Sequence, residues 1–245
     1  MRLAGARILV AGGAHRVGRE IALDLGSAGA DVAISYFRSA AAAEQTRAEL
    51  EALGRRTAAL RADASDVGEM EALVEEAAQA LGGLDAYVHA PSGGFVARPP
   101  QEIDEALWDQ AMLSTAKGFL FGARAAHGLM AGRGGVVLAI NDVAGLQPWP
   151  LFAAHCAAKA AQAQLVKCLA AAWGRDGIRV CAVAPGPVLM PEHLGQAAAD
   201  HAASETALGR LGSPSDVAQA VRYLLEADYV TGANLVVDGG RLLAS

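Results

Sequence analysis

The chain has 245 residues, of which 53% are hydrophobic, and its formal net charge at pH 7 is -6. This length suits one large α/β domain with a substantial core. The mild acidity and the absence of a basic run argue against nucleic acid, and no apolar stretch reaches the roughly 18 residues of a membrane span. Three scattered cysteines and no signal peptide indicate a cytoplasmic protein, and the histidines and cysteines form no cluster that predicts a metal site.

Short apolar segments alternate with helical patterns along the chain. We expect strands at residues 8–10, 32–36, 57–60, 84–89, 136–140, 178–184 and 233–237. Helical patterns cover residues 40–53, 103–130 with a break, 150–173 and 214–226, the last capped by Ser213, and another ends at Leu81 after a cap at Ser65 or Asp66. Buried strands alternating with crossover helices predict a single α/β domain over residues 1–245, a Rossmann-type doubly wound parallel sheet of about seven strands with helices on both faces.

The first strand runs into a glycine-rich turn, and a helical pattern begins where the turn ends. The turn reads Gly12-Gly13-Ala14-His15-Arg16-Val17-Gly18. Glycines allow a close backbone approach, and the free N–H groups of the next helix suit a pyrophosphate. A glycine turn alone is equally consistent with a purely structural role. Ligands in such sheets bind at the carboxyl ends of the strands, where this turn lies.

The end of the second strand predicts which dinucleotide binds. A site for NAD usually has Asp or Glu there, but this chain has Arg38 and Ser39. Guanidinium and hydroxyl groups suit a 2′-phosphate, so NADPH is the expected cofactor. Alternatively, Arg38 is a solvated charge and Ser39 a helix N-cap. Asp63 and Ala64 end the third strand, where the carboxylate accepts from the adenine amino group or belongs to a turn.

These motifs, in this order, resemble the short-chain dehydrogenase/reductase family over nearly the whole chain. They are the turn from Gly12 to Gly18, Asp63-Ala64, Ala157-Ala158-Lys159-Ala160, Ala184-Pro185-Gly186-Pro187-Val188, and the segment from Thr231 to Gly240. The chain looks most like the pteridine reductases in four respects. Arg16 replaces a glycine of the turn, Arg38-Ser39 follow the second strand, Asp142 replaces the catalytic Ser, and the loop 185–192 is similar.

The resemblance implies hydride transfer between a nicotinamide and a carbonyl, alcohol or C=N bond. Family members use a Tyr as proton donor, a Lys four residues later, and an Asn that orients a water. In this chain the corresponding positions hold His155, Lys159 and Thr115, and His89 and Ala90 replace two further Asn. The implied catalytic residues are Asp142, His155, Lys159 and Thr115. The implied cofactor residues are Gly12, His15, Arg16, Val17, Gly18, Arg38, Ser39, Asp63, Ala64, Lys159, Gly186 and Val188.

His155 has two interpretations. An imidazole beside a carboxylate is a competent acid or base, and Asp142 precedes it by thirteen residues. Imidazole is shorter than phenol, however, so a water or a shifted substrate has to complete the contact. Otherwise His155 is a remnant in a site that has lost this step, and Asp142 is only a turn residue.

We therefore expect an NADPH-dependent reductase of a carbonyl or pterin-like C=N compound. The alternatives are a non-redox acid/base enzyme, such as a dehydratase, cyclase or isomerase, and an NADPH-binding subunit without turnover. Residues 187–203 are the predicted substrate lid, and Phe95, Trp149 and Phe152 are candidates for an apolar pocket, although packing is the stronger interpretation for Phe152. A homodimer or homotetramer is expected through the alanine-rich helix 150–173, unless those alanines face the sheet.

Overall fold

A computed structural model describes residues 1–189 and 195–243. The strands are β1 (Arg7–Ala11), β2 (Asp31–Tyr36), β3 (Thr57–Arg61), β4 (Ala86–His89), β5 (Gly135–Ile140), β6 (Ile178–Pro185) and β7 (Asn234–Val237). The helices are α1 (Arg16–Ser27), α2 (Ala40–Ala52), α3 (Val67–Leu81), α4 (Glu105–Met112), α5 (Gly118–Met130), α6 (Ala153–Trp173), α7 (Gly195–Ser204) and α8 (Pro214–Glu226). Shorter helical turns are η1 (Pro100–Glu102), η2 (Leu113–Lys117), η3 (Val143–Gly145), η4 (Pro150–Phe152), η5 (Gly174–Asp176) and η7 (Arg241–Leu243).

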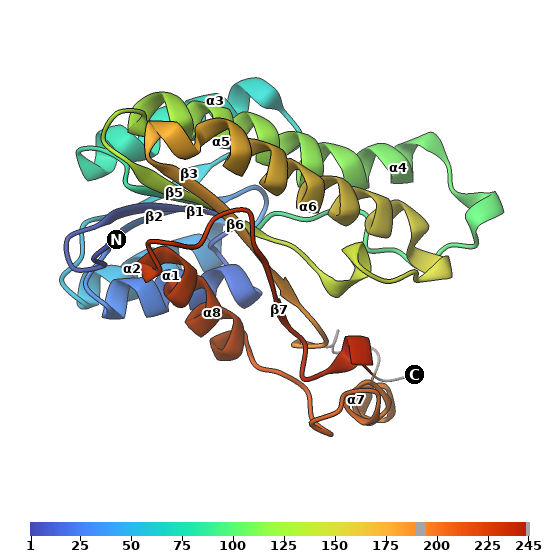
Figure 1. Cartoon of the computed structure of the whole chain (residues 1–245). Helices are drawn as coiled ribbons and strands as arrows, with labels where there is room; N and C mark the ends of the chain where they lie inside the picture. The colour runs from blue at the N-terminus through green and yellow to red at the C-terminus, as the bar shows by residue number, and fades with distance from the viewer. Residues whose placement is uncertain (190–194, 244–245) are drawn as a thin grey trace.

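The seven strands form one parallel sheet in the order β3-β2-β1-β4-β5-β6-β7. Helices α1, α2 and α8 cover one face, and α3, α5 and α6 cover the other (Figure 1). The doubly wound sheet predicted from the sequence is therefore confirmed. Strand order reverses between β1 and β4, because the chain leaves β1 toward β2 and β3 and later returns to the other side of β1.

Successive side chains of each strand point to opposite faces of the sheet, so a hydrophobic core forms on each face. In β1, Ile8 and Val10 pack into the layer of α1, α2 and α8, while Leu9 and Ala11 pack into the opposite layer. Each large aliphatic side chain buried in this way contributes about 1.5–3 kcal/mol of transfer free energy. Because both faces are covered, the strand ends and their loops are the places where polar groups can meet a ligand.

Two helix predictions need correction. The expected break within residues 103–130 is a π-helical turn, η2, which joins α4 to α5 without interrupting the helical path. The helix predicted from residue 150 begins at Ala153, after the 3₁₀ turn η4. Pro150 has no N–H to donate, and Phe152 has φ -121° and ψ 31°, outside the α-helical region, so the α-helical bonding starts one turn late.

The outer face of α6 bears on the predicted oligomer. Ala160 is exposed and Ala157 and Ala161 are half-buried, whereas Ala154 and Ala158 are buried inside the protein. The alanines thus divide between the two faces of the helix, and packing of α6 against a second copy stays a prediction. Within the described ranges, every helix is too short or too polar to cross a bilayer.

Side chains cap the N-termini of α3 and α8 at positions that the sequence suggests. Asp66, rather than Ser65, caps α3 by accepting from Glu69 N, and Ser213 caps α8 in a reciprocal capping box with Asp216. Ser39 also occupies an N-cap position, at α2, but its side chain makes no capping hydrogen bond. The N-cap interpretation of Ser39 is therefore not supported by its contacts.

This contrast predicts different stability losses at two serines. Ser213→Ala should lower the free energy of unfolding by about 1 kcal/mol, because the α8 amides lose an acceptor. Ser39→Ala should change it by less than about 0.5 kcal/mol, because no bond is lost. Urea unfolding followed by circular dichroism measures both, and equal losses at the two positions would contradict the assignment of the caps.

Candidate active site

A cleft of about 750 Å³ opens at the carboxyl ends of β1 to β4, where the strand order reverses. Ligands bind at this position in doubly wound sheets. The cleft brings together most of the residues predicted to hold a cofactor: Gly12, His15, Arg16, Val17, Gly18, Arg38, Ser39, Asp63 and Ala64. Ser35, which sequence reasoning missed, also lines it, and its Oγ accepts from Gly12 N at 3.0 Å.

The glycine turn has a backbone conformation that side chains at Gly12 and Gly18 would prevent. Gly12 has φ 72°, and a Cβ on Gly18 would lie 2.2 Å from the Gly12 carbonyl oxygen. Arg16 also has positive φ, 54°, which costs a non-glycine residue of order 1 kcal/mol. Its guanidinium donates to Leu189 O at 3.0 Å and so joins the turn to the segment after β6.

The residues present fit a dinucleotide. His15 is the N-cap of α1 but makes no side-chain capping bond, and the first turn of α1 contains no acid. The positive end of α1 is therefore open toward the cleft, as a pyrophosphate requires. Asp63 uses Oδ1 to accept from the backbone N and the Oγ of Ser65, which confirms a turn role, and its contact with adenine stays a prediction.

Asp142, His155 and Lys159 meet beyond the end of β5. Asp142 caps η3 by accepting from Ala144 N at 2.8 Å, and its other oxygen lies 3.4 Å from His155 Nε2. Lys159 Nζ donates to Ile140 O at 2.8 Å, and Ile140 lines the cleft. Residues four apart share one face of a helix, so α6 presents His155 and Lys159 together. The structure thus joins the three groups that the sequence placed far apart.

The three groups differ in their access to solvent. The His155 side chain is 3% exposed and that of Asp142 is 26% exposed, so Asp142 is the more accessible member of the pair. His155 Nδ1 is buried and has no partner among the described residues. Burial lowers the pKa of Lys159 to about 8, although the nearby Asp142 carboxylate opposes this shift.

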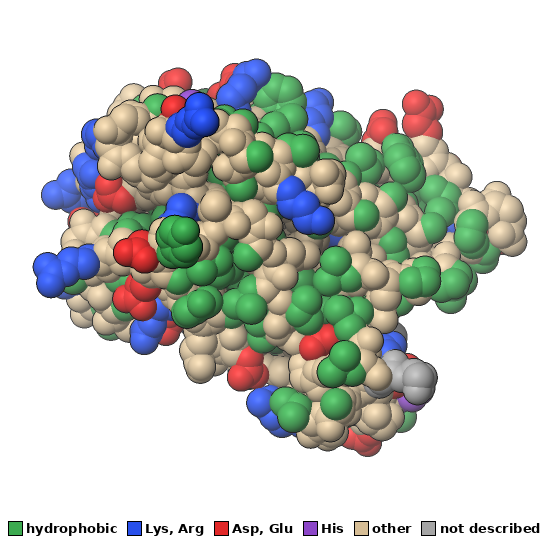
Figure 2. All heavy atoms as spheres, viewed as in Figure 1, with side chains coloured by type: hydrophobic (Ala, Val, Ile, Leu, Met, Phe, Trp, Pro, Cys, Tyr) green, Lys and Arg blue, Asp and Glu red, His purple; other side chains and the backbone are tan. Residues whose placement is uncertain are grey.

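Aromatic rings cover the buried imidazole. Phe95 lies edge to face with His155, with ring centroids 5.0 Å apart, and stacks on Phe152 at 4.6 Å. The ring centroids of Trp149 and Phe152 are 6.2 Å apart. Leu146 and Leu151 are exposed, and apolar side chains gather at the end of the molecule where α4 and the start of α6 lie (Figure 2). Phe95, Trp149 and Phe152 thus pack together beside His155, and their role as the lining of an apolar pocket stays a prediction.

Thr115 lies away from the open cleft. It is fully buried in η2, its hydroxyl has no partner among the described residues, and its carbonyl accepts from Gln162 Nε2 at 3.2 Å. A proton-relay role for Thr115 stays a prediction that these contacts do not favour. Sequence reasoning missed Gln162, which is one of two glutamines in the alanine-rich α6 and is the buried one.

His89 is bonded within the protein. Tyr87 Oη lies 2.7 Å from His89 Nδ1, and His89 Nε2 lies 3.0 Å from Ser114 O. The carbonyl accepts, so Nε2 carries the proton and Tyr87 donates to Nδ1. Burial lowers the pKa of His89 to about 3, which keeps the ring neutral. His89 therefore satisfies local polar groups within the protein.

The remaining predicted cofactor residues, Lys159 on α6 and Gly186 and Val188 after β6, are not in the lining of the cleft. Val188 is buried in the core, and a Cβ on Gly186 would lie 2.7 Å from Asp238 Cα, so close packing explains that glycine. Their contacts with a cofactor stay predictions. The proposed lid at 187–203 includes part of α7, but its residues 190–194 lie outside the described part of the chain.

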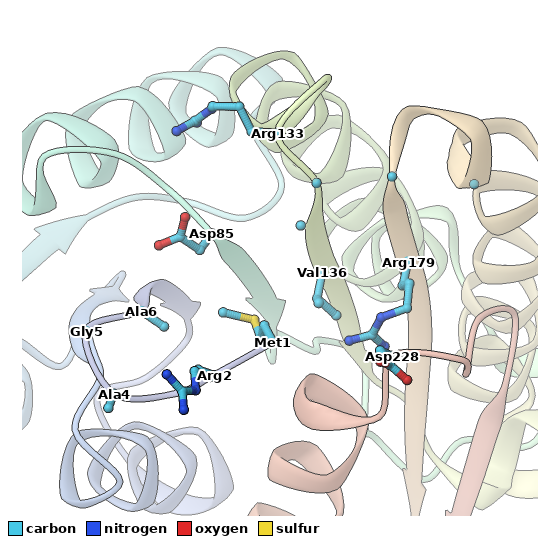
Figure 3. Close-up of a pocket in the computed structure, with 14 residues that line it drawn as sticks. Met1, Arg2, Ala4, Gly5, Ala6, Asp85, Arg133, Val136, Arg179 and Asp228 are labelled. Carbon is cyan, nitrogen blue, oxygen red and sulfur yellow. The ribbon is translucent and has the colours of Figure 1, made fainter.

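A second hollow of about 600 Å³ lies at the opposite, amino edge of the sheet (Figure 3). Its charged groups serve the fold: Asp85 pairs with Arg7, and Arg179 donates to the carbonyls of Leu224, Leu225 and Val230. No group of three or more potential metal ligands occurs within residues 1–189 and 195–243. The carboxyl-edge cleft is therefore the candidate active site.

Comparisons with known proteins agree with this geometry. The profile of the enoyl-(acyl carrier protein) reductase family matches residues 12–241. A 3beta-hydroxysteroid dehydrogenase 1 from Eggerthella lenta is 33% identical, over 98% of this chain and 95% of its own length. A short-chain dehydrogenase from Burkholderia cenocepacia, solved with NADP, has TM-score 0.92 and 31% identity, over 99% of this chain and 100% of that one.

A 7 alpha-hydroxysteroid dehydrogenase solved with NADH and 7-oxo glycochenodeoxycholic acid also has TM-score 0.92, with 30% identity over 98% of this chain and 95% of that one. Nicotinamide dinucleotides are thus bound by close structural relatives. The chain belongs to the short-chain dehydrogenase/reductase family. It is an oxidoreductase of that type, with a nicotinamide dinucleotide as its cofactor and a small molecule as its substrate.

The buried Lys159 predicts a pH dependence of stability. An unfolded Lys has a pKa near ~10.4, whereas that of Lys159 in the folded chain is about 8. Between these values the unfolded chain binds more protons, so the free energy of unfolding rises with pH. Relative to Lys159→Met, the wild-type chain should gain about 3 kcal/mol across this window, measured by urea unfolding.

Lys167, exposed on the same helix, supplies the control. Lys167→Met should show no comparable pH-dependent difference from the wild-type chain. If the stability difference between wild type and Lys159→Met stays constant from pH 8 to pH 10, the depressed pKa of Lys159 is wrong.

Proposed function

We propose that this protein is an NADPH-dependent reductase of a carbonyl or pterin-like C=N group on a small molecule. The observation that carries the proposal is the grouping of Asp142, His155 and Lys159 beyond the end of β5, where Lys159 is bonded to Ile140 of the cleft lining. A carboxylate, an imidazole and an ammonium together can hold a polar substrate and supply a proton. The likeness to pteridine reductases at Arg16, Arg38 and Asp142 supports the choice of substrate class.

The preference for NADPH rests on the corner of the cleft after β2. Arg38 lines the cleft and makes no hydrogen bond or ion pair with any residue of the described ranges. Ser39 leaves the N-terminus of α2 uncapped, and no acid lies in the first turn of that helix. An unpaired guanidinium, a free hydroxyl and an open helix N-terminus suit a phosphate dianion.

The proton route follows from the burial of the Asp142–His155 pair. When bound, the reduced nicotinamide supplies a hydride to the substrate carbon. The substrate oxygen or nitrogen meets Asp142 first, because its side chain is more exposed than that of His155. An imidazolium at His155 then passes its Nε2 proton, by way of Asp142 or a water beside it, to the substrate oxygen or nitrogen and becomes a neutral imidazole; this one proton balances the hydride. Lys159, fixed to Ile140 O, keeps a positive charge beside the carboxylate.

The cofactor preference predicts unequal losses on removal of Arg38. Arg38→Ala should weaken NADPH binding by roughly 10- to 100-fold, because charge-assisted hydrogen bonds contribute about 1.5–3 kcal/mol. Binding of NADH should change by less than about threefold. Arg47→Ala is the matched control, because Arg47 lies on α2 but is already paired with Glu44 and Glu51. Equal losses for the two cofactors, measured by calorimetry, would refute the phosphate assignment.

If His155 is the acid, its removal should lower turnover without weakening cofactor binding. His155→Ala should lower kcat by about 100-fold or more, because general acid catalysis typically contributes 10²–10⁴-fold. NADPH oxidation with a panel of carbonyl compounds and an oxidised pterin measures the rate, and calorimetry checks that NADPH still binds. Full turnover in His155→Ala would remove His155 from the mechanism.

A further variant distinguishes a modified site from a decayed one. If the site has merely decayed, His155→Tyr should raise carbonyl reduction. If the proposal holds, the same substitution should abolish the native reaction. Turnover of a substrate without consumption of NADPH would favour a dehydration, cyclisation or isomerisation instead, carried out by the same acid and imidazole.

A further inference from the structure

Phe37 contacts two arginines at the outer corner of the cleft. The ring follows β2 and lines the cleft, and about a third of it is exposed. The guanidinium carbon of Arg38 lies 5.1 Å from the ring centroid, and that of Arg61 lies at the same distance. Both distances are within the range of cation–π attraction. One aromatic ring thus contacts two cations at the edge of the cleft.

The sheet register explains why Arg61 reaches this corner. Arg61 is the last residue of β3, and its register partner on β2 is Tyr36, the residue before Phe37. Because parallel strands end at the same edge, the side chains that follow them arise side by side. β3 is also the edge strand of the sheet, and the Arg61 side chain is 58% exposed.

Neither of the two guanidiniums is in close contact with a carboxylate. Arg38 has no ion pair within residues 1–189 and 195–243. The Arg61 Nη1 is 3.8 Å from Glu69 Oε2, too far for a hydrogen bond, and that oxygen already accepts from Asp63 N at 2.8 Å. Other surface arginines, such as Arg19 and Arg124, contact carboxylates directly. The donors of Arg38 and Arg61 therefore remain available to an anion.

We propose that Arg61 is a second ligand of the cofactor's 2′-phosphate, and that Phe37 sets the spacing of the two arginines around it. This inference rests on the proposed preference for NADPH. A phosphate monoester carries about −1.5 to −2 charges at pH 7 and three strong acceptor oxygens, enough for two guanidiniums and the Ser39 hydroxyl. Without that phosphate, two like charges share one ring and repel each other. Arg61 therefore acts in cofactor choice and takes no part in the chemistry.

Two nucleotides that differ only at the 2′ position test this role without any turnover. Calorimetry gives the affinities of adenosine 2′,5′-bisphosphate and adenosine 5′-monophosphate, and their ratio reports the 2′-phosphate alone. Arg61→Ala should lower this ratio by roughly tenfold. Phe37→Ala should lower it by roughly threefold, because cation–π attraction at exposed sites is worth about 0.5–1 kcal/mol. Arg61→Glu should lower it further than Arg61→Ala, because a carboxylate repels the phosphate.

Arg124 supplies a matched control. Its guanidinium lies 4.6 Å from the Phe121 ring centroid and contacts Glu71, so it has the same kind of surroundings on α5, away from the cleft. Arg124→Ala should leave the ratio unchanged. Arg61→Lys should recover part of the ratio, because Lys keeps the charge but lacks the planar fork. Thermal unfolding of each variant confirms that the fold is intact.

The outcomes separate this inference from the proposed function. If Arg61→Ala leaves the ratio unchanged while Arg38→Ala lowers it, Arg61 is a solvated charge and the inference is overturned, but the preference for NADPH stands. If neither variant changes the ratio, both proposals fail. If both variants lower the ratio, and Phe37→Ala lowers it less, the two-arginine phosphate site is supported.

Discussion

The candidate site depends on one close backbone approach, between the Gly12 carbonyl and Gly18. The absence of a Cβ at Gly18 lets α1 start directly over the end of β1, where a methyl group would be 2.2 Å from the carbonyl oxygen. That approach aims the open N-terminus of α1 into the cleft at the point where strand order reverses. Most of the residues predicted to bind the cofactor line the cleft around this turn.

Charge varies along the cleft from the outer corner to the inner end. The outer corner holds Arg38, which has no ion pair among the described residues, Arg61, whose Glu69 partner is 3.8 Å away, and an uncapped helix N-terminus; these favour an anion. Next to Ile140 of the lining, beyond the end of β5, lie a carboxylate, a nearly buried imidazole and an ammonium whose pKa burial lowers. This distribution supports the proposed orientation of the dinucleotide, with its 2′-phosphate at the outer corner and its reacting group toward Asp142.

Behind the inner end, the protein satisfies buried carbonyls with its own side chains. The π-helical turn η2 exposes carbonyls to the interior, and His89 and Gln162 bond those of Ser114 and Thr115. Because an unpaired buried polar group costs about 1–3 kcal/mol, these side chains stabilise an otherwise unfavourable turn. The chain therefore keeps the family's fold, and its own side chains satisfy the carbonyls that this turn exposes.

Local features of the sequence were enough to predict the strands, most helices and the cap Ser213, and they limited the cap of α3 to Ser65 or Asp66. Apolar runs and capping residues act over a few neighbours, so they can be read without the fold. The pairing of Asp142 with His155 was also predictable, since a strand end and the start of the next helix lie close together. The starts of α4 and α6 were less predictable, because competing turn geometries differ by little free energy.

The sequence by itself determined the sheet, the cofactor turn and the identity of the acid, imidazole and ammonium. Only the tertiary structure decided how deeply these groups are buried and which other side chains contact them. It placed Phe95 over His155, Gln162 against Thr115, and Arg61 beside Phe37. The physical reason is that burial and contact depend on packing between segments distant in the chain. The lowered pKa of Lys159 follows from that packing and from no local pattern.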